Sequence, residues 1–231
     1  KPFTLGLEPL DGAYLILKIG STSKLRTHDM VDKLMSPDKE TIARYLNTIT
    51  APWNEYSPNS LLELRCFADN RTPNIARFTY SEISQAVAHG EAMNEYGLNV
   101  YACVNPVQPG DAFSSKAASD QDIQQAFFAF ADCDEPGIAE QIPKNAPPYD
   151  FRVITGTEPH LRCHYYWQLK GPLCDLTEWK TVQKQLAAKY GTDPAICNPS
   201  RLMRVGGTIS YPDRKKQERG YINELTRMEQ G

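Results

Sequence analysis

Two aspartates that end an apolar run are the residues best suited to chemistry. Residues 127–131 are apolar and are followed by Asp132, Cys133 and Asp134. Because side chains two positions apart lie on the same side of a strand, both carboxylates would project together from the end of a buried strand. Neighbouring carboxylates repel each other unless a cation neutralises them, and Mg²⁺ and Mn²⁺ prefer oxygen ligands. The pair therefore indicates a metal site; the alternative is a simple turn, since Asp-Cys-Asp-Glu-Pro-Gly is typical of one.

A second candidate segment, residues 156–167, has Arg162, His164 and Tyr166 at alternating positions. In a strand these three side chains share one face. Arg162 could bind a phosphate through two parallel hydrogen bonds, and His164 could donate another. The alternative is a strand edge with a histidine whose hydrogen bonds are satisfied within the fold.

The third candidate segment combines a carboxylate with a basic cluster. Asp193 is a possible third metal ligand, or else a turn residue before Pro194. The chain as a whole has a net charge of −3, so any attraction for nucleic acid must come from a local patch. Residues 201–219 could form that patch or could be a solvated loop. The basic side chains in this segment are Arg201, Arg204, Arg214, Lys215, Lys216 and Arg219.

In this order the three segments resemble the archaeo-eukaryotic primase superfamily. The greatest similarity is to the primase-polymerase domains in replication proteins of phages, plasmids and other mobile elements. The resemblance rests on Asp-x-Asp, on His164 before Tyr-Tyr-Trp, and on Asp193 followed by Asn-Pro-x-Arg-x-x-Arg and a Gly-Thr turn. It covers about residues 60–225. The family usually has a small residue where this chain has Arg162.

The resemblance implies an α/β (α+β) fold, in which an RRM-like antiparallel sheet carries the acidic pair beside an N-terminal α/β module. It implies template-directed transfer of nucleotides from NTPs or dNTPs on single-stranded DNA, by two divalent ions, Mg²⁺ or Mn²⁺. The implied catalytic metal ligands are Asp132, Asp134 and Asp193. The implied nucleotide-binding residues are Arg162, His164, Arg201 and Arg204. From the basic segment, we expect Lys215, Lys216 and Arg219 to bind nucleic acid.

Two other functions compete with this interpretation. The chain could be a non-catalytic replication-initiator module that binds nucleic acid and holds a structural ion or none. A rolling-circle endonuclease would need a His-x-His metal pair, whereas His160 and His164 are four positions apart. In the intact protein we expect a helicase or accessory domain beyond this segment.

Composition excludes several broad classes. The 231 residues are 41% hydrophobic and include 3 Trp, 12 Tyr and 8 Phe, which is too many aromatics for a disordered chain. There is no apolar run long enough to span a membrane. The six cysteines show no C-x-x-C spacing, so we expect reduced core residues in a cytoplasmic protein, bacterial or virus-encoded, rather than a zinc ribbon or disulfide frame.

The elements that must position these residues follow from hydrophobic periodicity. We expect an N-terminal helical and loop extension over residues 1–60, packed on a catalytic core over residues 61–231. Predicted strands cover residues 15–17, 61–67, 99–104, 127–131, 151–155, 163–169 and 221–225. Predicted helices cover residues 28–35, 37–48, 81–96, 119–125 and 175–190, with Ser36 as a helix cap and a loop at 52–58. The last helix should bury a stripe of Leu176, Trp179, Val182, Leu186 and Tyr190.

Overall fold

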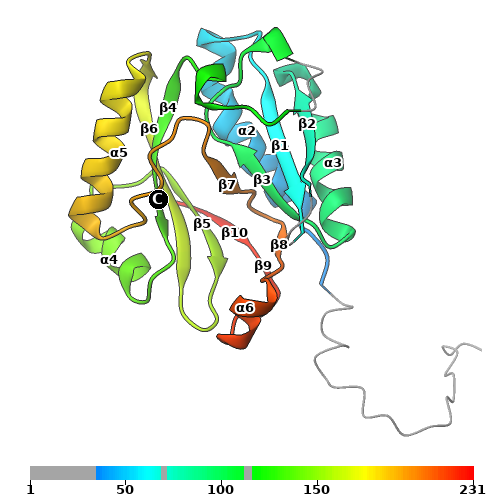
Figure 1. Ribbon diagram of the computed structural model, residues 1–231, viewed down its shortest axis with the longest axis vertical. Coiled ribbons are helices and arrows are strands. Elements are labelled where there is room, and N and C mark those ends of the chain that lie inside the picture. The colour runs from blue at the N-terminus through cyan, green and yellow to red at the C-terminus, as the bar shows by residue number, and fades with distance from the viewer. Residues whose placement is uncertain (1–34, 69–71, 112–115) are drawn as a thin grey trace, which may run out of the picture. The chain divides into compact units, whose positions relative to one another are not determined.

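Two four-stranded antiparallel sheets form the framework of the computed structural model, which describes residues 35–68, 72–111 and 116–231 (Figure 1). The first sheet has the order β2-β1-β3-β7, with strands Asn74–Phe78, Leu62–Phe67, Asn99–Cys103 and Leu202–Arg204. The second has the order β10-β5-β6-β4, with strands Arg227–Gln230, Phe151–Gly156, Arg162–Leu173 and Ala126–Cys133. A two-stranded ladder joins β8 (Ile209–Ser210) to β9 (Glu224–Leu225). The strand expected at 15–17 and nearly all of the helix expected at 28–35 lie outside the described residues.

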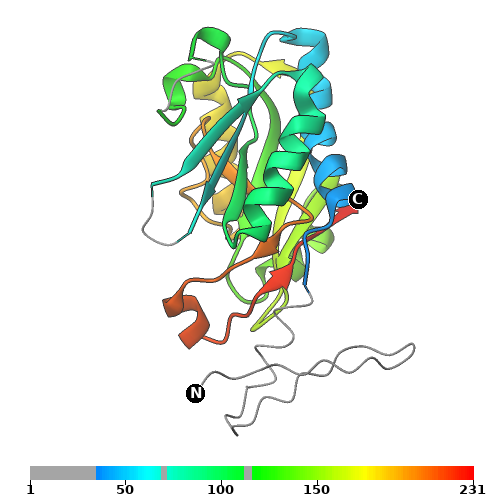
Figure 2. The same ribbon diagram turned by 90° about the vertical axis from the view of Figure 1, so that its right-hand side faces the viewer.

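One hydrophobic core connects both sheets with the helices α2 (Lys39–Tyr56) and α3 (Ile83–Glu95). Leu64 of β1 and Val100 of β3 enter this core from the first sheet, and Phe130 and Tyr166 enter it from the second. A separate cluster packs the other face of the second sheet against α4 (Ile138–Asn145) and α5 (Leu176–Tyr190). Figures 1 and 2 show α3 beside the first sheet, and Figure 1 shows α4 and α5 beside the second.

This architecture confirms the predicted fold class. The second sheet is antiparallel and carries the acidic pair at the end of β4. The first sheet, with α2 and α3, forms the N-terminal α/β module, although its edge strand β7 comes from the third sequence motif. In the part of the chain that the structure describes, no helix combines the length and hydrophobicity needed to cross a membrane.

Helix α2 corrects the loop predicted at residues 52–58. The helix continues through Pro52 to Tyr56, and its N-cap is Asp38 rather than Ser36. A proline inside a helix costs about 3 kcal/mol because it lacks an N–H and crowds the preceding turn. Here Ile49 and Trp53 flank the proline on the buried face, and their burial in the core offsets that cost.

Helix α5 follows the predicted boundaries but not the predicted stripe. Val182 is 37% exposed, whereas Gln183 is buried. The Gln183 amide accepts from the N–H of Phe130 at 3.1 Å and donates to its carbonyl at 2.9 Å, and Trp179 Nε1 donates to the carbonyl of Phe128 at 2.9 Å. The polar side chain is buried because it satisfies the free edge of β4.

The prediction lacked β2, α4, β7, β8, α6 (Arg214–Glu218) and β10. Strand β10 pairs with β5 through residues far apart in the sequence, which local periodicity cannot reveal. The helix predicted at 119–125 is a single 3₁₀ turn, Asp120–Asp122, and the strand predicted at 221–225 is reduced to β9. All six cysteines are free, and Cys66, Cys103, Cys133 and Cys163 are buried as expected.

Candidate active site

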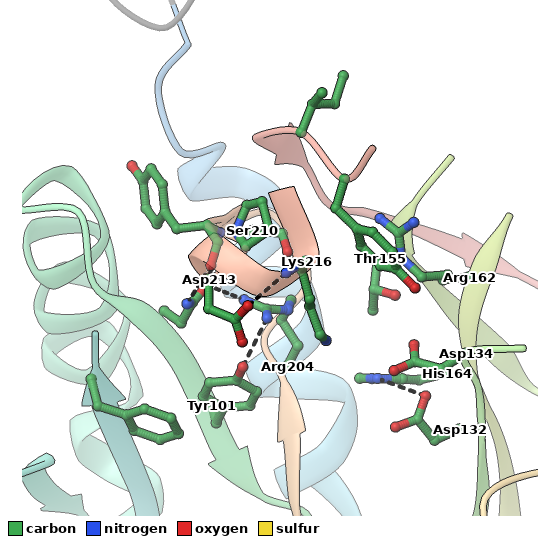
Figure 3. Close-up of a pocket in the computed structure, with 16 residues that line it drawn as sticks. Tyr101, Asp132, Asp134, Thr155, Arg162, His164, Arg204, Ser210, Asp213 and Lys216 are labelled. Carbon is green, nitrogen blue, oxygen red and sulfur yellow. Dashed lines mark hydrogen bonds and ion pairs between the residues drawn. The ribbon is translucent and has the colours of Figure 1, made fainter. Parts of the chain in front are cut away.

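One cavity of about 290 Å³ brings many of the predicted site residues together. It is lined by side chains from both sheets and from the segment between residues 210 and 222 (Figure 3). The predicted residues in its wall are Asp132, Asp134, Arg162, His164, Arg204 and Lys216. The predicted residues outside its wall are Asp193, Arg201, Lys215 and Arg219.

The strand ladder places Asp132 directly opposite His164, because β4 and β6 are neighbours and these two residues are paired in register. Asp132 Oδ1 lies 3.5 Å from His164 Nε2. Neither Asp132 Oδ1 nor His164 Nδ1 has a hydrogen-bond partner among the described residues, although both atoms are buried. Asp134 lies beside them at the cavity (Figure 3). Buried polar atoms are rarely left unpaired, so this wall is suited to a ligand that would complete it.

Asp193 is held next to the acidic pair by the main chain. Its N–H donates to the carbonyl of Asp132 at 3.1 Å, which satisfies another group on the edge of β4. Its carboxylate accepts from the N–H of Ala195 at 2.8 Å and lies 3.7 Å from the Arg201 guanidinium. The third carboxylate is therefore adjacent to the first two but is already paired within the fold.

Electrostatics set the protonation of the two facing residues in opposite directions. Burial, together with the carboxylates of Asp134 and Asp193, raises the pKa of Asp132 well above that of an ordinary aspartate. Burial lowers the pKa of His164 well below that of an ordinary histidine. At neutral pH the imidazole is therefore uncharged, and Asp132 is the group whose charge a bound cation would stabilise.

The acidic wall suits a hard divalent cation only as a partial coordination sphere. Within the described ranges, no three His, Cys, Asp or Glu side chains converge as a complete metal-binding group. Asp132 and Asp134 present carboxylate oxygens to the cavity, and Asp132 Oδ1 has no hydrogen-bond partner within the described residues. Mg²⁺ is commonly held in this way, by one or two carboxylates together with substrate phosphates and water. The residues present therefore fit such an ion.

Arg162 lies in the wall but is extensively bound within the fold. Its Nη2 lies 3.0 Å from Glu224 Oε2, and its guanidinium packs 4.3 Å from the centroid of the Tyr221 ring. It also donates to the carbonyls of Glu158 and His160. Its charge is neutralised by a partner on β9, which leaves it few donors for a phosphate.

Arg204 and Lys216 are the cations that face the acidic wall (Figure 3). Lys216 lies on α6 (Arg214–Glu218) and forms no ion pair with any residue that the structure describes; its ammonium is 5.6 Å from the Tyr221 ring. Lys215 and Arg219 are exposed, and the Arg219 guanidinium lies 5.4 Å from the same ring. The basic segment is thus divided between the cavity and the surface outside it.

Sequence reasoning missed Asn99, Tyr101, Tyr221 and Glu224. All but Glu224 line the cavity, and all four bind the predicted cations. The alternation in the strand at 99–104 could have placed Asn99 and Tyr101 on one face. Nothing in the local pattern indicates that this face meets the third motif.

Comparisons with known proteins agree with this geometry at the level of the fold. Neither a protein-family model nor a curated protein matches the chain. Among solved structures, the chain is similar to the AEP domain of the primase-polymerase of cyanophage S-2L, with a TM-score of 0.58 and 19% identity over 84% of this chain and 90% of that one. It is also similar to the primase RepB', with a TM-score of 0.51 and 14% identity over 81% of this chain and 56% of that one. The chain therefore shares its fold with a primase-polymerase AEP domain and with a primase, as the resemblance of its three motifs predicted.

Proposed function

We propose that the chain is a catalytic primase-polymerase domain, which transfers nucleotides from NTPs or dNTPs to a 3′-hydroxyl on a single-stranded DNA template. The observation that carries the proposal is the meeting of an acidic wall, Asp132 and Asp134, with the cations Arg204 and Lys216 around one cavity. Carboxylates attract the divalent ions that accompany a nucleoside triphosphate, and the cations attract its phosphates. The shared fold with a primase-polymerase and a primase supports this proposal.

Phosphoryl-type transfer of this kind depends on positioning and charge rather than on a covalent nucleophile. His164 is neutral, so it binds a phosphate oxygen as a hydrogen-bond donor without adding charge. Arg204 and Lys216 neutralise the polyphosphate from the opposite side of the cavity. Together these three residues orient the α-phosphorus toward the attacking hydroxyl.

Asp132 and Asp134 would hold Mg²⁺ or Mn²⁺, and the nearby carboxylate of Asp193 adds negative charge to their surroundings. When bound, such ions lower the pKa of the 3′-hydroxyl and stabilise the charge of the leaving pyrophosphate. In the metal-free protein, burial and repulsion from the neighbouring carboxylates favour protonation of Asp132, so ion binding and proton release are coupled.

The template would follow basic side chains outside the cavity. Lys215 and Arg219 are exposed on and after α6, next to the cavity that Lys216 enters. Their charges suit the phosphates of a single strand, whose binding depends strongly on salt. A helicase or accessory domain in the intact protein would supply further contacts to DNA.

Incorporation of labelled nucleotides on single-stranded templates, with Mg²⁺, Mn²⁺ or EDTA, tests the proposal. We expect template-dependent products with either ion and none in EDTA. Asp132→Asn and Asp134→Asn should each lose at least about 100-fold in rate, because they remove charge that holds the ions. Asp175→Asn is the matched control: Asp175 caps α5 away from the cavity, and asparagine caps a helix equally well.

The same assay discriminates against the non-catalytic alternative. A replication-initiator module would bind single-stranded DNA but would incorporate no nucleotide with either ion. That outcome, or full activity of both aspartate variants, would overturn the proposed function. Circular dichroism of each variant shows whether the fold survives the substitution.

A further inference from the structure

Two stacked aromatic rings and a guanidinium that contacts one of them line the wall of the cavity that the first sheet provides. The rings of Phe67 and Tyr101 have centroids 4.9 Å apart and planes inclined by only 11°. On the Tyr101 ring lies the guanidinium of Arg204, 4.8 Å from the centroid. The register explains the arrangement, because Tyr101 of β3 and Arg204 of β7 are directly opposite each other. The guanidinium of Arg204 therefore packs against an aromatic ring before any ligand binds.

Two hydrogen bonds also fix the direction of the guanidinium. Arg204 Nη2 donates to the hydroxyl of Tyr101 at 2.8 Å, and Nη1 donates to Asn99 Oδ1 (Figure 3 shows the bond to Tyr101). Both partners are neutral, and Arg204 forms no ion pair with a carboxylate among residues 35–68, 72–111 and 116–231. Arg204 is thus held in one orientation while its charge remains available, in contrast to Arg162, which is paired with Glu224.

Asn99 also holds the segment that leads to Lys216, the other cation of the cavity that has no ion pair with a described residue. Its Nδ2 donates to the carbonyl of Tyr211 at 2.8 Å, and its Oδ1 accepts from the N–H of the same residue at 2.9 Å. Two residues later, Asp213 caps α6 by accepting from the N–H of Lys216 at 2.7 Å. One buried amide therefore anchors both Arg204 and the start of the helix that carries Lys216.

We propose that Asn99 and Tyr101 are positioning residues, which hold Arg204 toward the polyphosphate of the incoming nucleotide. The inference rests on the proposed function, because it assigns the ligand of Arg204 from it. A flexible arginine loses side-chain entropy when it binds a ligand, and that loss weakens affinity. Here the stack and the two hydrogen bonds order Arg204 in advance. Asn99 and Tyr101 act through Arg204 and do not touch the reacting atoms.

Tyr101→Phe is the decisive variant, because it keeps the ring, the stack with Phe67 and the contact with Arg204 but removes the hydroxyl acceptor. The probes are inorganic tripolyphosphate and a non-hydrolysable nucleoside triphosphate, titrated calorimetrically. We expect the affinity for both to fall by about 3- to 10-fold, the range of one net hydrogen bond. The KM for nucleotide should rise by the same factor, with kcat unchanged.

A double-mutant cycle separates positioning from other roles. In an Arg204→Ala background, Tyr101→Phe should have no further effect, because the residue through which it acts is gone. An equal loss in both backgrounds would overturn the inference, since the hydroxyl would then act on the ligand directly or on the fold. A loss for the nucleotide but not for tripolyphosphate would also overturn it, because it would place the base or sugar at Tyr101. Asn99→Ala should lose only part of its effect in the Arg204→Ala background, because Asn99 also holds the segment that leads to Lys216.

Tyr165→Phe is the matched control. Arg152 Nη1 donates to the Tyr165 hydroxyl at 3.1 Å in the same kind of arginine–tyrosine pair, but on the face of the second sheet that packs against α4. It should leave both affinities unchanged. Normal incorporation by the wild type with unchanged affinity in Tyr101→Phe would overturn this inference alone. No incorporation, together with the expected cycle on tripolyphosphate, would overturn the proposed function alone.

Discussion

The two walls of the cavity differ in how far the fold satisfies their polar groups. On the wall of the second sheet, Asp132 Oδ1 and His164 Nδ1 are buried without a hydrogen-bond partner within the described residues. On the wall of the first sheet, Arg204 is bound by a stacked ring, a hydroxyl and a buried amide. The acidic wall is left incomplete, whereas the basic wall is ordered.

The difference follows from what each wall would bind. A divalent ion carries charge and its own water ligands, so a carboxylate that binds it needs no hydrogen-bond partner in the metal-free protein. A polyphosphate is flexible and charged, so a pre-ordered cation binds it at a lower entropic cost than a mobile one. Neutral partners such as Asn99 and Tyr101 orient Arg204 without cancelling its charge. Glu224, in contrast, cancels the charge of Arg162.

The largest effect within this comparison is expected at His164, the unsatisfied donor of the acidic wall. His164→Ala should weaken binding of a non-hydrolysable nucleotide by about 10- to 150-fold, equivalent to about 1.5–3 kcal/mol for a hydrogen bond to a charged group. Binding of single-stranded DNA should change little. Calorimetry gives the first affinity and fluorescence anisotropy the second. His89 on α3 also has a buried Nε2 with no hydrogen-bond partner in the described part of the chain, so His89→Ala is the control. An unchanged nucleotide affinity in His164→Ala would return His164 to a purely structural role.

A smaller effect should separate the two arginines of the third motif. Arg204→Ala should weaken binding of inorganic tripolyphosphate by about 10-fold or more, because its hydrogen bonds to a charged ligand are lost. Arg201 lies outside the cavity wall and is paired with Asp193, so Arg201→Ala should change that affinity by less than about 2-fold. Equal losses in both variants would show that the distinction between a free and a paired arginine has no functional meaning here.

The two neighbouring lysines on α6, Lys215 and Lys216, should bind different ligands: the template strand and the nucleotide. Lys215→Ala should reduce the slope of single-strand affinity against log salt by about 0.7, the value of one phosphate contact, and leave the KM for nucleotide unchanged. Lys216→Ala should raise that KM and leave the salt slope unchanged, because Lys216 lines the cavity. Salt titrations followed by anisotropy, with steady-state kinetics, measure both quantities. If the two variants show the same profile, α6 serves a single ligand and not two.

The smallest effect concerns stability without metal. An unfolded aspartate loses its proton near pH 4, whereas the raised pKa of Asp132 keeps the proton to higher pH in the folded state. Between these values the folded state binds more protons, so stability falls as the pH rises. Asp132→Asn removes this dependence.

In EDTA, Asp132→Asn should therefore melt a few degrees higher than the wild type at pH 8, with a difference that shrinks toward pH 4. The lowered pKa of His164 destabilises the fold below about pH 6.5 in both proteins, so comparison of the two isolates Asp132. Differential scanning calorimetry at several pH values measures the difference. Parallel curves would contradict the assigned protonation.

Alternation along single strands was enough to predict the acidic wall. The apolar run before Asp132 forms a buried strand, and Asp134 lines the same cavity as Asp132. Helix ends were equally readable, since Asp175 caps α5 and Gly191 ends it with a positive φ of 69°. These features depend on near neighbours in the sequence, so no knowledge of the tertiary fold was needed.

The partners of the charged residues could not be predicted in the same way. Glu224 lies 62 positions from Arg162, and Asn99 lies 105 positions from Arg204. Lys215 and Lys216 are adjacent in the sequence, but successive side chains on a helix point about 100° apart, so only one enters the cavity. Pro52 reads locally as a break, yet packing of its neighbours in the core keeps α2 helical.

The sequence by itself determined which chemical groups are present and which of them share a strand face: two carboxylates at the end of one strand, a histidine on another strand and a basic segment after Asp193. Only the tertiary structure decided which charges remain available. Arg162 and Arg201 form ion pairs with carboxylates within the fold, whereas Arg204 and Lys216 form none with any residue that the structure describes. The reason is physical: a charged side chain can bind a ligand only if no opposite charge within the fold already pairs with it. The groups that form such pairs come from distant parts of the chain.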